Sequence, residues 1–95
     1  MRRGDVVTVV LPGGYGTPRP GLVVQHDAYG ALASVTVLPL TSDVRSLPLV
    51  RIPIAPSEET GLRIASDVQV DKIMTVPKDK IGRRLGALDE SSMKK

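Results

Sequence analysis

Proline and glycine divide this chain into short runs, and most of these runs are rich in β-branched residues. Eight prolines and nine glycines are spread over 95 residues, and residues 5–11 and 34–40 are the clearest β-branched runs between them. β-branched side chains fit the pleated, half-buried surface of a sheet, and the breakers keep each strand short. We therefore expect a mainly β fold of about six short strands, a small and strongly bent sheet or barrel, with one helix at the C-terminal end.

The boundaries of the remaining elements follow from the same breakers. We expect the longest strand over residues 63–76, with a bulge or bend near residues 66–67, because its apolar positions follow a period of two only in part. Pro77 ends this strand, and one helical turn and a short strand at residues 83–88 follow it. Asp89 suits the N-cap of the terminal helix. Two further strands are expected at residues 21–25 and 49–54.

Length and composition limit what the chain can be. We expect one small domain, residues 1–95, which buries only about 60–65% of its unfolded surface and gains stability from a partner subunit. Cysteine is absent, which removes disulfides and thiolate metal sites and fits a reducing compartment, and a single histidine argues against a zinc site. We expect no cofactor.

No run of about 18 apolar residues is present, so we expect a cytoplasmic protein. Only six residues follow Asp89, which is marginal for a helix, and a continuation of the native chain past Lys95 is left open.

The net charge of +3 comes from the C-terminal part of the chain. Residues 1–76 hold seven basic and seven acidic side chains, whereas residues 77–95 hold six basic and three acidic ones. A basic tail favours a polyanion such as RNA, although a solvated helical face accounts for it equally well. Two tyrosines, with no phenylalanine or tryptophan, leave few platforms on which bases could stack.

Arg19 is the strongest candidate for a functional residue. It stands between Pro18 and Pro20. Proline fixes its own φ and pushes the preceding residue to extended geometry, so Arg19 has little backbone freedom. Residues 12–18 hold three glycines and two prolines, and we expect there a flexible loop that can fold over Arg19 as a substrate lid. A guanidinium held this rigidly suits a binding site better than a solvated surface.

Thr41 and Ser42 follow the strand expected at residues 34–40. Hydroxyl groups are accessible where a strand ends, although ordinary turn chemistry through bonds to the backbone is the simpler reading. Pro39 cannot donate to a strand ladder, so this end of the strand is expected at an edge or a bulge.

Six segments form an ordered set along the chain: residues 3–7, 19–27, 38–42, 61–62, 65–76 and 85–89, with Ile81 before the last of them. This ordered set resembles the MazF/PemK (Kid) family of toxin endoribonucleases from type II toxin–antitoxin systems. The resemblance implies an SH3-like barrel of the MazF/CcdB/Kid type with a C-terminal helix. It further implies a homodimer that cuts single-stranded RNA, including mRNA, at short sequences without metal and so inhibits translation and growth. A cognate antitoxin protein would neutralise it.

The resemblance also implies which residues form the site. The family's catalytic arginine, threonine and aspartate correspond to Arg19, Thr41 and Asp71. The sequence departs from the family where Lys72 replaces the usual glutamine and where Gln69 takes a position that the Kid branch fills with arginine. These departures bear on base specificity and on acid–base pairing, and no metal ligand is expected. The residues expected to bind RNA are Ser42, Tyr15, Gln25, His26, Gln69 and Lys72.

Cleavage of RNA without metal sets its own chemical requirements. The 2′-hydroxyl attacks the adjacent phosphorus, which needs a proton acceptor, a proton donor and stabilisation of the charge on the phosphorane oxygens. Arg19 and Thr41 suit the third task, because a guanidinium forks onto phosphate oxygens and a hydroxyl adds one more donor. Asp71 and His26 both remain open as the acceptor. The products would carry a 2′,3′-cyclic phosphate and a 5′-hydroxyl.

Two alternatives of other classes are compatible with the same pattern. CcdB toxins share the fold and bind DNA gyrase, but they act through a C-terminal helix that ends in Trp-Gly-Ile, and this chain has no tryptophan. The second alternative is an SH3-like module that binds RNA or protein without catalysis. An RNA-cleavage assay separates this module from the enzyme.

Overall fold

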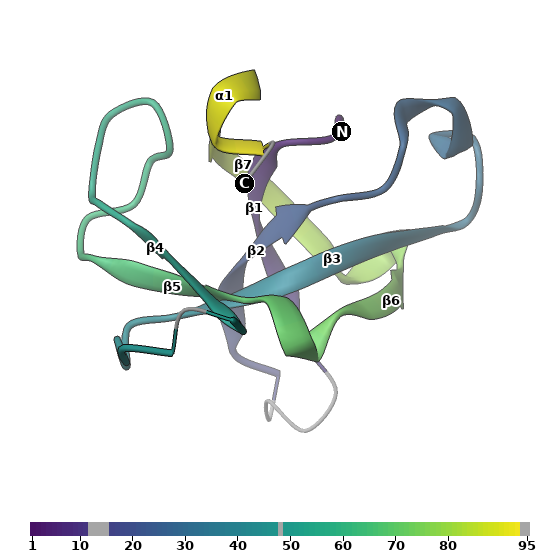
Figure 1. The fold of residues 1–95 in the computed structure, drawn as a ribbon. Coiled ribbons are helices and arrows are strands. Elements are labelled where there is room, and N and C mark those ends of the chain that lie inside the picture. The colour runs from purple at the N-terminus through teal and green to yellow at the C-terminus, as the bar shows by residue number, and fades with distance from the viewer. Residues whose placement is uncertain (12–15, 48, 94–95) are drawn as a thin grey trace.

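The computed structural model describes residues 1–11, 16–47 and 49–93, and it consists mainly of antiparallel strands (Figure 1). The strands are β1 (Asp5–Val10), β2 (Pro18–Val23), β3 (Ser34–Thr41), β4 (Arg51–Ile54), β5 (Ser66–Gln69), β6 (Met74–Pro77) and β7 (Ile81–Ala87). The 3-10 turns are η1 (Asp27–Tyr29), η2 (Val70–Lys72) and η3 (Lys78–Lys80), and the helix is α1 (Glu90–Met93). The predicted mainly β class with a C-terminal helix is confirmed, with seven strands in place of about six.

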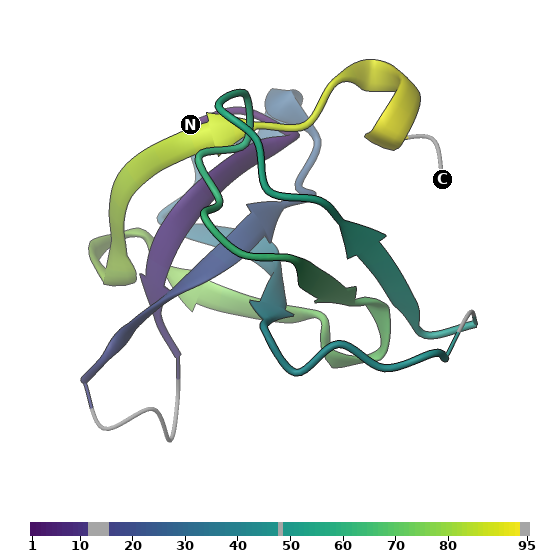
Figure 2. The ribbon, with the colours of Figure 1, turned by 90° about the vertical axis from the view of Figure 1, so that its left-hand side faces the viewer.

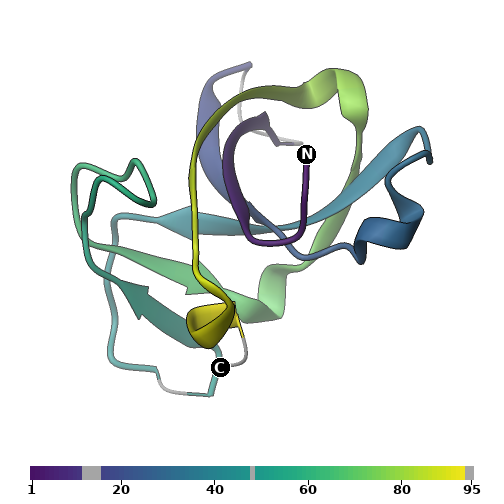
Figure 3. The ribbon, with the colours of Figure 1, turned by 90° about the horizontal axis from the view of Figure 1, so that it is seen from above.

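The strands form one bent sheet in the order β4-β5-β3-β2-β1-β7, and β6 pairs with β3. Seen from above, β1 and β7 curve together (Figure 3). Within the described part of the chain the outermost strands, β4 and β7, do not pair with each other. The loop after β4 reaches β7 instead, where Ala87 N donates to Glu59 O at 2.7 Å (Figure 2). The strongly bent sheet that the sequence predicts is therefore present.

Gly61 lets the loop at residues 57–62 lie directly against β7. Its φ is +73°, a left-handed conformation that glycine adopts without strain, and a Cβ atom at this position would lie 2.1 Å from the carbonyl oxygen of Leu85. The loop is also closed on itself, because Gly61 N donates to Ser57 O at 3.0 Å and Leu62 is buried. This segment is held firmly, and it ends beside the candidate site.

Two apolar cores lie on opposite faces of the central strands. In β1, Val6 belongs to one core and Val7 to the other, because successive side chains of a strand point to opposite faces. β2 and β3 divide their residues in the same way, so each of these three strands is buried on both faces. Each fully buried Val or Leu stabilises the fold by about 1.5–3 kcal/mol.

The prediction of one continuous strand at residues 63–76 is wrong. It consists of β5 and β6, separated by η2, and both pair with β3. Leu40 faces Val68 and Val37 faces Met74, so the break lies opposite the two residues between them, of which one is Pro39. Proline offers no N–H to a ladder, which accounts for a break at this place. The edge or bulge expected at Pro39 is thus replaced by a change of partner strand, since β3 is a central strand. Of the bulge or bend predicted near residues 66–67, the bulge is absent, since both residues pair regularly with β4, whereas the chain bends at residues 63 and 64.

β2 begins three residues before the predicted start and includes both prolines that flank Arg19. β3 pairs with Gly21–Val23 alone, so the first half of β2 has β1 as its only strand neighbour among the described residues. Prolines are tolerated where one side of a strand is unpaired. The 3-10 turn η1 follows this strand.

The C-terminal part follows the prediction closely. The helical turn after Pro77 is η3, β7 covers the predicted short strand, and Ser92 N donates to Asp89 Oδ1 at 2.7 Å. Asp89 is thus the N-cap of α1. In the described residues, no helix has the length and apolar character that a membrane crossing needs.

Candidate active site

A groove of about 790 Å³ lies where the first half of β2, the end of β3 and β7 meet the segment before β5. It contains four of the predicted site residues, Arg19, Thr41, Ser42 and Gln69. The other lining residues are Thr8, Leu11, Pro20, Pro39, Leu40, Gly61, Leu62, Arg63, Ile64, Ser66, Arg83 and Leu85. Most of the lining residues belong to strands, which position side chains more firmly than loops do.

Arg19 is exposed and stands opposite Val9 in the β1–β2 ladder. Its backbone is extended, as its two proline neighbours require. No carboxylate of the described residues lies within ion-pair distance of its guanidinium. The reading of Arg19 as a surface ion pair therefore has no support in this part of the chain, and its five N–H donors face the groove's solvent.

Thr41 is the last residue of β3, and Ser42 follows it at the rim of the groove. The hydroxyl oxygen of Thr41 accepts a hydrogen bond from Asp43 N at 3.1 Å, so Thr41 does take part in turn chemistry. A hydroxyl that accepts from a backbone N–H still has its own proton to donate. The bond therefore orients Thr41 and leaves its O–H available to an oxyanion.

Asp71 and Lys72 lie elsewhere. Both belong to η2, where they are exposed, and neither lines the groove. Gln69, two residues before Asp71, is the last residue of β5 and does line it. The structure therefore brings Arg19, Thr41, Ser42 and Gln69 together but does not bring Asp71 to them.

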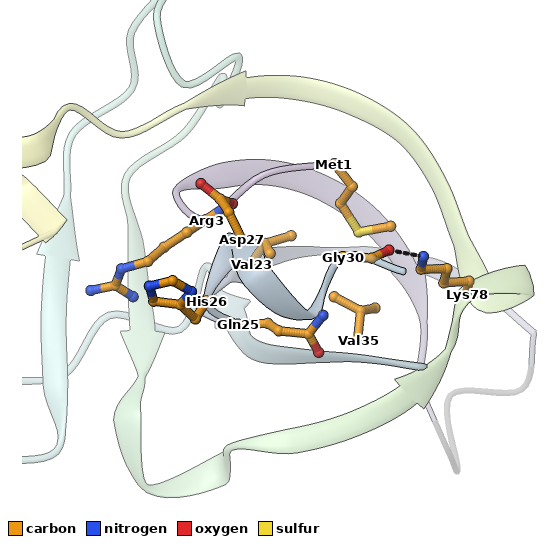
Figure 4. A pocket seen from close by; sticks show the side chains of 9 residues that line it. All are labelled: Met1, Arg3, Val23, Gln25, His26, Asp27, Gly30, Val35 and Lys78. Carbon is orange, nitrogen blue, oxygen red and sulfur yellow. Dashed lines mark hydrogen bonds between the residues drawn. The ribbon is translucent and has the colours of Figure 1, made fainter. Parts of the chain in front are cut away.

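Gln25 and His26 line a second, much smaller pocket of about 20 Å³ on the side of η1 (Figure 4). Gln25 Nε2 donates to Tyr29 O at 3.0 Å, and its Oε1 accepts from Thr36 N at 3.3 Å. His26 Nδ1 accepts from Ala28 N at 3.0 Å, which makes it the N-cap of η1. These side chains hold the turn and are not part of the groove. Tyr15, also expected to bind RNA, lies outside the described residues.

Arg63 and Arg83 line the groove but were not predicted from the sequence. Arg63 follows the loop held by Gly61, and Arg83 lies on β7 beside Thr8, whose Oγ1 accepts from Arg83 N at 3.0 Å. These arginines and Arg19 are far apart along the chain, so only the fold brings them together. Within the described chain, no three His, Asp or Glu side chains gather into a metal-binding group.

Comparison with known proteins identifies the family. A family model described as "PemK-like, MazF-like toxin of type II toxin-antitoxin system" matches residues 2–95. The chain belongs to this family. The MazF-like toxin is also 46% identical, over 94 residues, to a probable endoribonuclease MazF of Mycolicibacterium smegmatis, a match that covers 98% of this chain and 86% of that protein.

Solved structures agree with this assignment. One is an endoribonuclease in complex with its cognate antitoxin from a mycobacterial species, with a TM-score of 0.82, 30% identity, and coverage of 99% of this chain and 84% of that one. Another is the Mycobacterium tuberculosis toxin MazF-mt6, with a TM-score of 0.77, 28% identity, and coverage of 95% of this chain and 84% of that one. The fold of the MazF-like toxin is thus the fold of MazF structures.

Proposed function

We propose that this MazF-like toxin is an endoribonuclease that cuts single-stranded RNA, including mRNA, in the cytoplasm and thereby stops translation and growth. The observation that carries the proposal is the groove in which Arg19, Thr41 and Ser42 meet. A cation and two hydroxyls around one open site form a set of donors for a phosphate group. The curated relative, a probable endoribonuclease, adds independent support.

In the proposed mechanism the 2′-oxygen of one nucleotide forms a bond to the adjacent phosphorus, and the bond from phosphorus to the 5′-oxygen of the next nucleotide breaks. The 2′-hydroxyl gives up its proton, and the leaving 5′-oxygen gains one. Arg19 donates two hydrogen bonds to the non-bridging oxygens, and the hydroxyl of Thr41 donates a third. These bonds stabilise the charge of the transition state where it develops. The proton acceptor stays a prediction from the sequence, because Asp71 and His26 both lie outside the lining of the groove.

Base selection is proposed for Gln69. Its amide offers both donors and an acceptor, and it lies in the groove with Ser42. The edges of unstacked bases in single-stranded RNA present complementary groups. Mapping the 5′ ends of RNA cleaved in cells would give the recognised sequence.

The proposal predicts that RNA is cut without added metal and that a single modification of the substrate abolishes cutting. An oligonucleotide that holds the recognised sequence should be cleaved at the same rate with and without EDTA. It should become resistant when the one nucleotide before the scissile phosphate lacks its 2′-hydroxyl, because the nucleophile is then missing. Mass spectrometry should find a 2′,3′-cyclic phosphate and a 5′-hydroxyl. Cleavage of the 2′-deoxy substrate would contradict the mechanism.

We further propose a homodimer and an inhibiting cognate antitoxin. Three large apolar side chains are exposed close to one another, those of Leu47, Leu49 and Val70. The two segments that contain them are in contact, since Val70 N donates to Val50 O at 3.0 Å. Such a surface suits a partner protein. The arginines of the groove suit an acidic segment that folds on binding and covers the site. A related endoribonuclease was solved with its cognate antitoxin.

Sedimentation measures both partner proposals in one experiment. The toxin alone should sediment with twice the 10.1 kDa of the chain at micromolar concentration.

The antitoxin encoded beside it should displace a labelled, uncleavable RNA from this dimer. The affinity for RNA and the affinity for the antitoxin should both fall with salt as charged contacts are screened. A monomer would contradict the dimer, and a ternary complex of toxin, RNA and antitoxin would contradict inhibition by covering the groove.

A further inference from the structure

The arginines of this chain divide into two groups by the partners of their side chains. Arg3 Nη1 donates to Val24 O at 3.2 Å. Four others pair with a carboxylate: Arg2 with Asp27, Arg45 with Asp43, Arg51 with Asp67 and Arg84 with Asp5. For the side chains of Arg19, Arg63 and Arg83, no ion pair or hydrogen bond is present among the described residues, and all three line the groove. The guanidinium groups of the described chain that have neither an ion pair nor a hydrogen bond are therefore gathered in one place.

No acidic residue belongs to the lining of this groove as the described residues form it. Three like charges in one concave surface repel one another and raise the local concentration of anions. This arrangement costs stability in the free protein unless an anion occupies the groove. A polyanion with several charges at regular intervals would satisfy all three groups.

The backbone around the additional arginines is fixed. Arg63 follows Leu62, which is buried, and Gly61, which contacts β7 so closely that a side chain there would clash. Arg83 lies within β7, and its N–H donates to the hydroxyl of Thr8. Leu85 lines the groove together with Arg83, whereas Arg84 lies outside the lining and pairs with Asp5. The two cations are thus presented from rigid segments.

We propose that Arg63 and Arg83 bind the backbone phosphates of the RNA that flank the phosphate held by Arg19. This inference rests on the proposed function and deepens it, because it fixes the path of the RNA between β2, β7 and the segment before β5. Contacts to phosphates position a strand without reading its sequence. Arg63 and Arg83 therefore contribute affinity for every sequence, while Arg19 acts on the reacting phosphate.

The salt dependence of RNA binding tests this proposal. For a single strand, each phosphate neutralised by the protein adds about 0.7 to the slope of log affinity against log salt concentration. Arg63→Gln and Arg83→Gln should each lower the slope by about 0.7, which corresponds to about a fivefold loss of affinity at 0.1 M salt. The probe is a labelled oligonucleotide with a 2′-deoxy nucleotide at the cleavage position, and its binding is measured by fluorescence anisotropy. With cleavable RNA, KM should rise by the same factor while kcat changes little.

Arg84→Gln is the matched control. It removes the same charge from the neighbouring position of β7, and Asp5 keeps a hydrogen bond from Arg2 N at 2.9 Å. Its salt slope should equal that of the unchanged protein. If Arg63→Gln and Arg83→Gln also keep that slope while the unchanged toxin cuts RNA, the phosphate path is wrong and the proposed function stands. If these variants lose affinity for the antitoxin but keep their affinity for RNA, the arginines belong to the inhibitor's site and the proposal fails. If the unchanged toxin cuts no RNA, the proposed function itself fails.

Discussion

Replacing Arg19 by alanine is expected to lower the rate of RNA cleavage about a hundredfold or more while the fold stays intact. The side chain is exposed and bonds to no other described residue, so its loss should not affect packing. Its proposed role is to hold the phosphorane oxygens, and removal of one such preorganised donor typically lowers kcat about 100- to 1,000-fold. Single-turnover kinetics at saturating RNA would measure the chemical step, and circular dichroism would check the fold.

Arg19→Lys separates the charge of Arg19 from its geometry. Lysine keeps the positive charge but loses the planar fork that bonds two oxygens at once, so we expect a rate between those of the unchanged protein and the alanine variant. Arg63→Ala is the control for lost charge in the same groove, and it should change KM more than kcat. A rate for Arg19→Ala within twofold of the unchanged protein would remove Arg19 from the catalytic step.

Local patterns were sufficient for much of the fold. Pro77 ends β6 as predicted, and the N-cap at Asp89 and the turn after Pro77 could be assigned from single residues. The interruption at η2 could not be placed in this way. It depends on a residue of another strand, Pro39, which lies opposite the break once β3 has paired with β5 and β6.

The candidate site was predictable where one segment contains the constraint. The two prolines around Arg19 and the strand end at Thr41 are local features, and both residues line the groove. Arg63 and Arg83 have no such local sequence signal, because their significance comes from the fold, which brings them to the same groove and leaves them without an ion pair among the described residues. Asp71 shows the opposite case. The family pattern points to it, yet η2 places it outside the groove lining, and its role stays a prediction.

A buried ion pair holds the loop that follows Thr41 and Ser42. Arg51 Nη1 lies 3.5 Å from Asp67 Oδ2, and the two side chains are only 10% and 1% exposed. Arg51 Nη1 also donates to Asp43 O at 3.2 Å, and Asp67 Oδ2 accepts from Arg45 N at 2.8 Å. The pair therefore ties β4 and β5 to the loop that follows Thr41 and Ser42. Asp67 is also the strand partner of Thr41.

Arg51→Met is expected to destabilise the protein by about 3–5 kcal/mol, because it leaves the carboxylate of Asp67 buried without a counterion. A small domain has a free energy of unfolding of about 5–15 kcal/mol, so this is a large share of the total. Asp67 Oδ1 already lacks a hydrogen-bond partner among the described groups, which adds to the cost of losing Arg51. Urea unfolding, monitored by circular dichroism, would give the change in unfolding free energy.

Two further variants separate this effect from the loss of side-chain volume. Arg51→Met combined with Asp67→Asn buries no charge and keeps an oxygen to accept from Arg45 N, so it should recover more than half of the lost stability. Arg45→Met breaks an ion pair of 2.9 Å whose side chains are 61% and 64% exposed, and it should cost only about 0–1 kcal/mol. If Arg51→Met costs no more than Arg45→Met, the buried pair does not stabilise the fold. A double variant as unstable as Arg51→Met would attribute the loss to packing of the Arg51 stem, since the uncompensated charge would then have no measurable effect.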